Sequence, residues 1–104
     1  MPFTAIFMYP NHEDTHFDDS YYVKTHMPLV EAIWKKYGLQ GWKIAKLPTT
    51  LDGSRSEYLI MTTLDWYSEE GLQEALRDSA SAQLHADIPN FTNKHPITLA
   101  GANL

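Results

Sequence analysis

A histidine on the apolar face of an expected helix is the residue in this chain best suited to acid–base chemistry. A helix is expected from Asp18 or Asp19 to about Tyr37. Five of its residues follow one another at steps of four, three, four and four: Tyr22, His26, Leu29, Ile33 and Tyr37. Residues at these steps share one stripe of a helix. The neighbours of His26 in the stripe are mostly apolar, so its ring is expected to point into the interior. An imidazole there can accept or donate a proton near neutral pH.

Pro28 follows His26 by two residues and is expected to disturb the helix there. Proline has no backbone N–H, so it frees the carbonyl of Lys24 and bends or splits the helix. A kink beside an inward-facing histidine leaves room for a ligand. The alternative is that His26 is a structural core residue, bonded to a backbone carbonyl or to a tyrosine hydroxyl. The sequence leaves both interpretations open.

Aromatic residues are numerous enough to line an apolar pocket for a planar ligand, although each of them can equally be core. The strand and helix stripes converge on Tyr22, Tyr58 and Trp66, which makes these three the best candidates for the pocket wall. The other expected pocket residues are Ile33, Phe91 and, at a pocket edge, His95.

The segment His12–His16, HEDTH, matches the HExxH pattern of zinc proteases. That pattern binds zinc only when both histidines lie on one face of a helix. Here Pro10-Asn11 precedes the segment, and the helix cap follows it at Asp18 or Asp19. We therefore expect a solvated loop and no metal, although His12 or His16 can still contact a ligand.

Composition excludes several classes of protein. The chain has 104 residues, no cysteine and a formal net charge of −5. It therefore has no disulfide framework or thiol nucleophile, and its charge argues against nucleic acid as a partner. No apolar run approaches the roughly 20 residues of a membrane span, and residues 1–10 do not resemble a signal peptide. We expect one domain over residues 1–104, a cytoplasmic location and no cofactor bound through a recognisable motif.

The order of elements predicts a β-α-β, β-α-β chain, the ferredoxin-like arrangement of an antiparallel four-stranded sheet with both helices on one face. Ser68 is expected to cap the second helix, with Leu72, Ala75, Leu76 and Ser79 on its inner face, and residues 80–91 look like another helical turn or two. The expected strands are 3–9, 41–47, 58–64 and 95–102.

Two of these strands, 3–9 and 58–64, are apolar on both faces. In the third strand Tyr58, Ile60 and Leu64 point one way, whereas Leu59 and Met61 point the other way. Two helices can cover only one face of the sheet. A second copy of the same sheet most simply covers the other face, so we expect a homodimer.

The run from Tyr21 to Val30, YYVKTHMPLV, resembles the Y-Y-x-x-x-H-x-P-L signature of the EthD family, named for a component of ethyl tert-butyl ether degradation. Supporting likenesses are the opening strand, the Tyr37-Gly38 helix end before Gly41-Trp42, and the Asp-x-Pro-x-Phe element at 87–91. The resemblance covers nearly the whole chain. It implies an α+β fold that pairs into a dimeric α/β barrel, and a role in a catabolic or polyketide-related pathway. Relatives with this barrel act as monooxygenases, cyclases, isomerases or dehydratases without a cofactor.

Two hypotheses of function follow. In the first, the chain is a cofactor-independent enzyme for a small hydrophobic metabolite. By the resemblance, His26 is its general acid–base and Tyr22 a hydrogen-bond partner, with Tyr22 and Tyr58 holding a developing oxyanion. In the second, it is an accessory protein that binds or delivers a hydrophobic compound. A purely structural dimeric module is a third option. Catalysis requires a polar partner for His26 and one ring nitrogen facing an open cavity.

Overall fold

The structure is a computed structural model that describes residues 2–104. Its sheet consists of four strands: β1 (Phe3–Pro10), β2 (Leu39–Lys46), β3 (Tyr58–Trp66) and β4 (Ile97–Ala102). The first helical segment contains α1 (Asp19–Tyr21), the π turn η1 (Tyr22–His26), α2 (Met27–Trp34) and η2 (Lys35–Tyr37). The second contains α3 (Glu69–Arg77), η3 (Ser79–Ser81), α4 (Ala82–Asp87) and η4 (Ile88–Asn90).

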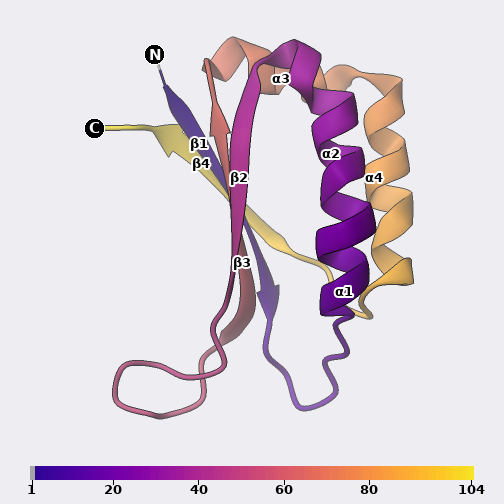
Figure 1. Cartoon of the computed structure of the whole chain (residues 1–104). Coiled ribbons are helices and arrows are strands. Elements are labelled where there is room, and N and C mark those ends of the chain that lie inside the picture. The colour runs from indigo at the N-terminus through magenta and orange to yellow at the C-terminus, as the bar shows by residue number, and fades with distance from the viewer. Residues whose placement is uncertain (1) are drawn as a thin grey trace.

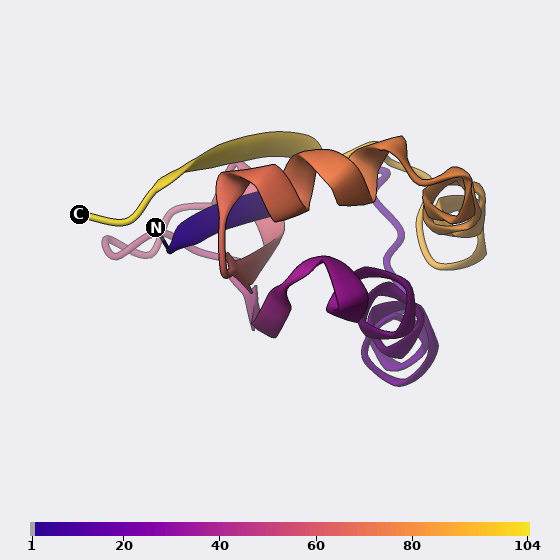
Figure 2. The ribbon, with the colours of Figure 1, turned by 90° about the horizontal axis from the view of Figure 1, so that it is seen from above.

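The sheet is antiparallel, with strand order β2-β3-β1-β4. The two helical segments lie on one side of it, with α2 and α4 next to each other (Figure 1). Seen from above, none of the helices formed by residues 2–104 lies over the opposite face (Figure 2). This is the ferredoxin-like fold predicted from the order of elements. No helix among residues 2–104 is long and apolar enough to cross a membrane.

The ends of the helices are where the capping residues predict them. The Asp18 side chain accepts a hydrogen bond from the Tyr21 N–H and begins the first helical segment. Gly38 ends that segment with a φ of 102°, a left-handed conformation that favours glycine. The Ser68 hydroxyl accepts from the Gly71 N–H and begins α3. Each cap satisfies a backbone group that the helix leaves without a partner.

The first helical segment contains a π turn immediately before Pro28. There the Met27 N–H donates to the carbonyl of Tyr22, five residues earlier. A π turn takes up one more residue than an α turn, so it shifts every later residue around the helix. Tyr22 and His26 are buried as predicted, but the buried residues after them are Met27, Val30 and Trp34. The predicted Leu29, Ile33 and Tyr37 are only half-buried.

The second helical segment differs from its predicted inner face. Leu72 and Ala75 are buried in the core, whereas Leu76 is 55% exposed and Ser79 is exposed. Prediction failed for these two residues because α3 ends at Arg77 and Leu76 lies at the rim of a cavity. The last strand also begins two residues later than predicted, at Ile97, because Pro96 cannot donate to the ladder.

The face of the sheet opposite the helices is apolar. The side chains of Phe3, Ala5 and Tyr9 face the helices and are buried. The side chains of Ile6 and Met8, which alternate with these residues along β1, face the other way. There Ile6 pairs with Leu99, and Met8 pairs with both Met61 and Ile97. The apolar outer face, as we call it, is formed by Ile6, Met8, Leu59, Met61, Ile97 and Leu99. Ile97 and Leu99 are 42% and 56% exposed.

Candidate functional site

A cavity of about 670 Å³ lies between the helical layer and the sheet. Its size is within the range of small-molecule sites. Strands β1, β3 and β4 contribute to its wall, as do both helical segments. Much of the wall is apolar, and its apolar side chains include Phe7, Val30, Trp34, Leu64, Leu84 and Ile88. The polar groups on this wall are therefore the ones that can fix the orientation of a ligand.

His26 is a buried histidine on the cavity wall, and Asp87 is its hydrogen-bond partner. Nδ1 of His26 lies 2.8 Å from Oδ2 of Asp87. An ionised carboxylate can only accept hydrogen bonds, so we assign the ring proton to Nδ1. The other nitrogen, Nε2, then has a free lone pair.

Asp87 is held in place by three donors. Its Oδ1 accepts hydrogen bonds from the Tyr21 hydroxyl at 2.6 Å and from the Asn90 amide at 2.9 Å, while Oδ2 faces His26. Burial raises the pKa of Asp87, but the hydrogen bonds from Tyr21, Asn90 and His26 outweigh it and leave the pKa below its ordinary value. The carboxylate is therefore ionised near neutral pH.

The His26 ring is enclosed by aromatic residues. It stacks on the Tyr22 ring, with centroids 5.4 Å apart, and its centroid lies 4.5 Å from that of Phe91. Burial lowers the pKa of His26 below its ordinary value, and the opposing effect of Asp87 does not compensate for it. His26 is therefore mainly neutral near pH 7, the state in which Nε2 can accept a proton.

Nε2 of His26 has no hydrogen-bond partner within residues 2–104. In the same part of the chain, Nε1 of Trp66 is the one fully buried side-chain nitrogen or oxygen without a partner. Nε2 therefore keeps some accessible surface, and His26 lines the cavity. A neutral imidazole with one nitrogen fixed by a carboxylate and the other accessible is suited to general acid–base chemistry.

The cavity contains some of the predicted site residues and not others. Tyr22, His26 and His95 line it. Tyr22 contacts His26 through its ring face, and its hydroxyl bonds to Thr62.

The remaining predicted pocket residues lie outside the cavity wall. Trp66 is completely buried against Trp34, and Phe91 is buried behind His26. Ile33 is half-buried and packs against the core. Tyr58 lies at a separate shallow depression beside His12.

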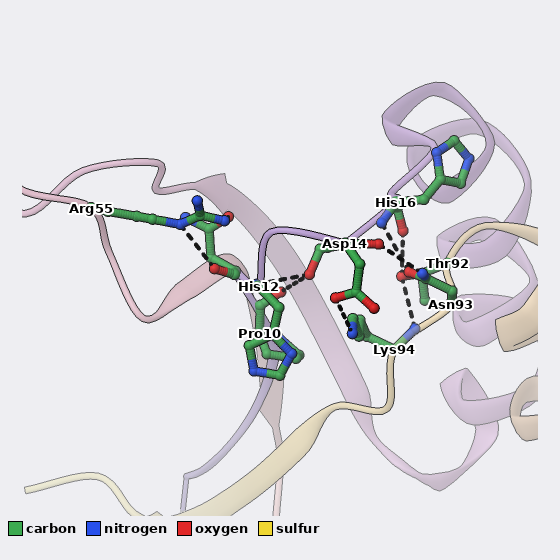
Figure 3. Close-up of polar contacts among 10 residues, drawn as sticks. Pro10, His12, Asp14, His16, Arg55, Thr92, Asn93 and Lys94 are labelled. Atoms are coloured by element: carbon green, nitrogen blue, oxygen red, sulfur yellow. Dashed lines mark hydrogen bonds and ion pairs between the residues drawn. The ribbon is translucent and has the colours of Figure 1, made fainter.

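The HEDTH segment is a loop, as expected. Figure 3 shows how it is attached to the segment that precedes β4: Asp14 pairs with Lys94, and Asn93 bonds to the backbone at His16 and Asp14. Within residues 2–104 no three His, Cys, Asp or Glu side chains come together as a metal site. The loop secures the chain immediately after Phe91, next to the His26–Asp87 pair.

Asp87 is the site residue that the sequence reasoning missed. The sequence marks it only through the Asp-x-Pro-x-Phe element at 87–91, a supporting likeness to the EthD family. That element was the available signal, because one short segment supplies three contacts. Asp87 bonds to His26, Asn90 donates to Asp87, and Phe91 packs on the ring of His26.

Comparison with solved structures first defines the class of fold. A dimeric ferredoxin-like protein from Thermobifida fusca superposes with a TM-score of 0.62 at 12% identity, over 99% of this chain and 92% of that one. SnoaB, a cofactor-independent oxygenase from Streptomyces nogalater, gives a TM-score of 0.62 at 8% identity, over 99% and 95%. At such identities the likeness concerns the fold alone.

Two further structures are more similar. An EthD-like protein from Ralstonia eutropha is 26% identical with a TM-score of 0.85, over 96% of this chain and 89% of that one. An ethyl tert-butyl ether degradation (EthD) family protein from Bacillus halodurans is 25% identical with a TM-score of 0.77, over the full length of both. The resemblance to the EthD family is therefore confirmed. No protein-family model matches the chain, and no curated protein sequence matches it.

Proposed function

We propose that this chain is an enzyme that needs no cofactor and transfers a proton on a small apolar metabolite. The observation that supports the proposal is the pairing of Asp87 with His26, which lines the cavity and whose Nε2 has no partner within residues 2–104. His26 is the general acid–base, and Asp87 fixes its tautomer and orientation. We place this activity in a catabolic or secondary-metabolic pathway.

The alternative role is an accessory protein that binds or delivers a hydrophobic compound. The large and mostly apolar cavity favours it, because binding requires only shape and apolar lining. The two roles differ in the need for a base. An accessory protein does not require a histidine with one nitrogen held by a carboxylate and the other accessible.

A test of the base uses 5-nitrobenzisoxazole, a small planar probe that a base converts without any cofactor. The base removes the carbon-bound proton, its electron pair forms the nitrile, and the N–O bond breaks to give a phenolate. We expect the wild-type protein to accelerate this elimination and His26→Gln to lower the rate by about 10²- to 10⁴-fold, the usual contribution of a general base.

The matched control is His16→Gln, at an exposed histidine that does not line the cavity, which should keep the wild-type rate. A His26→Gln protein as fast as wild type would overturn the proposal. A wild-type protein that gives no acceleration would overturn it as well.

We also propose that the protein is a homodimer that joins two copies through the apolar outer face. Exposed apolar patches of this kind mark association surfaces. The similar Thermobifida fusca protein is dimeric and ferredoxin-like, which supports the same assembly.

A further inference from the structure

Two buried hydroxyl groups on the cavity wall have no part in the His26–Asp87 pair. Tyr22 in η1 and Thr62 in β3 are 2% and 1% exposed, and both line the cavity. Their oxygens lie 2.6 Å apart. The same wall includes the apolar side chains of Phe7, Val30 and Leu64.

The two hydroxyls have more protons than protein acceptors. Tyr22 and Thr62 carry one proton each, and the bond between them uses only one. The ring of Tyr9 lies edge-on to that of Tyr22, with centroids 5.8 Å apart, and burial raises the pKa of Tyr9, so its hydroxyl stays protonated as well. Within residues 2–104 the remaining proton has no protein acceptor.

We propose that the hydroxyl pair of Tyr22 and Thr62 binds the oxygen of the substrate, and that this substrate is an apolar ketone with a proton on the carbon next to its carbonyl. The proposal rests on the proposed role of His26 as the base. The Tyr22 ring stacks on the His26 ring, so an oxygen at the hydroxyl pair brings the adjacent carbon into the part of the cavity where His26 lies.

The reaction is balanced without a further reagent. Nε2 of His26 takes the proton from the carbon, and the C–H electron pair forms the carbon–carbon double bond of an enolate. The carbonyl π pair moves to the oxygen, where the spare hydroxyl proton stabilises the charge. Return of the proton from His26 restores the ketone. Burial raises the pKa of Tyr22 to about 12, so its hydroxyl donates rather than acting as a base.

The binding test uses 1-tetralone and tetralin, which share one ring system and differ in the ketone. Quenching of tryptophan fluorescence reports binding, because Trp34 lines the cavity. We expect the wild-type protein to bind 1-tetralone about tenfold more tightly than tetralin, the effect of one hydrogen bond. Thr62→Val removes a hydroxyl at constant volume and should abolish the preference while the affinity for tetralin stays the same.

Tyr22→Phe is the second variant, and it should also abolish the preference. It keeps the proposal testable if Thr62→Val fails to fold. Equal binding of the two compounds by the wild-type protein, binding of neither, or an undiminished preference in a folded hydroxyl variant would overturn the hydroxyl site.

The reaction test follows deuterium exchange at the carbon next to the carbonyl of 1-tetralone by proton NMR. The wild-type protein should accelerate exchange, and Thr62→Val should slow it at least tenfold. His26→Gln should abolish exchange yet keep the preference for 1-tetralone. If His26→Gln exchanges like wild type, the base is wrong while the hydroxyl site survives. If exchange requires His26 but not Thr62 or Tyr22, the base survives and the hydroxyl site is wrong.

Discussion

His26 and Asp87 are separated by 61 positions in the chain and meet at 2.8 Å, with His26 on the cavity wall. Neither residue alone defines the candidate site. The hydrogen bonds of a buried imidazole set its tautomer, and Asp87 places the proton on Nδ1 by accepting from it. Tyr21 and Asn90 in turn hold Asp87 through its second oxygen, so the orientation of the base depends on all four residues.

Replacing Asp87 by Asn tests the tautomer. An amide N–H can donate to Nδ1, which would place the ring proton on Nε2 and remove the accessible lone pair. We expect Asp87→Asn to lower the rate of 5-nitrobenzisoxazole elimination at least tenfold. Asp65→Asn, at an exposed aspartate on β3, is the control and should leave the rate unchanged. A wild-type rate in Asp87→Asn would exclude a role for the carboxylate.

The lowered pKa of His26 predicts a pH dependence of stability. The unfolded chain titrates His26 near 6.5 and the folded protein below this value, so between the two pKa values the unfolded state binds more protons. Stability therefore rises with pH in this window and is lost as the pH falls from about 6.5 toward the folded pKa. Urea unfolding at a series of pH values should show this slope in wild type and its absence in His26→Gln. Identical slopes in the two proteins would contradict the assignment.

Asp87 also makes the stability rise with pH, but in a lower pH range. Its pKa in the folded protein lies below the ordinary value of 3.8, so its contribution to stability is present above that value and is lost as the pH falls through the folded pKa. The His26 window begins at about 6.5 and the Asp87 window only at 3.8, so the slope just below pH 6.5 reports His26.

At the scale of elements, the π turn determines which residues reach the cavity. It places Tyr22 and His26 inward and then shifts the buried stripe to Val30 and Trp34. The step pattern of the sequence predicts the first pair because it precedes the extra residue. It fails for Leu29 and Ile33 because a π turn leaves no mark on apolar spacing. Pro28 indicates only that the regular hydrogen bonding is disturbed nearby.

The strands and caps were predictable because each depends on local chemistry. Asp18, Gly38 and Ser68 satisfy helix ends through their own side chains or backbone conformation. The cavity wall was less predictable, because its composition depends on how distant segments of the chain pack. Trp66 and Phe91 have the right residue type for a pocket, yet packing in the core buries them.

The contact between α3 and the end of the first helical segment is close at Gly71. A Cβ added there would overlap the backbone carbonyl oxygen of Tyr37. Because that atom belongs to the backbone, the helices would have to move apart, and we expect Gly71→Ala to lower the free energy of unfolding by about 1–3 kcal/mol. Urea denaturation measures this. Gly41→Ala, where an added Cβ meets nothing within 4 Å, is the control. Equal stability of the two variants would refute the close contact.

At the scale of the whole molecule, the apolar outer face should bring two copies together. Met61 lies within it, paired with Met8 on β1 and with Ala45 on β2. Met61→Arg would bury a charge without a partner at such an interface, so we expect this variant to be monomeric. Light scattering reports the mass. Gln73→Arg adds the same charge on the exposed side of α3 and should remain dimeric. An unchanged mass for Met61→Arg would rule out this face.

The most direct test of the central claim is the protonation state of the His26 ring, which can be measured without a substrate. Nitrogen-15 NMR of the histidine rings distinguishes a protonated from an unprotonated ring nitrogen. His26→Gln assigns the signal. The account predicts that near neutral pH Nδ1 carries the proton and Nε2 does not, and that His26 titrates below its ordinary value of 6.5. A proton on Nε2, or a pKa above 6.5, would contradict it.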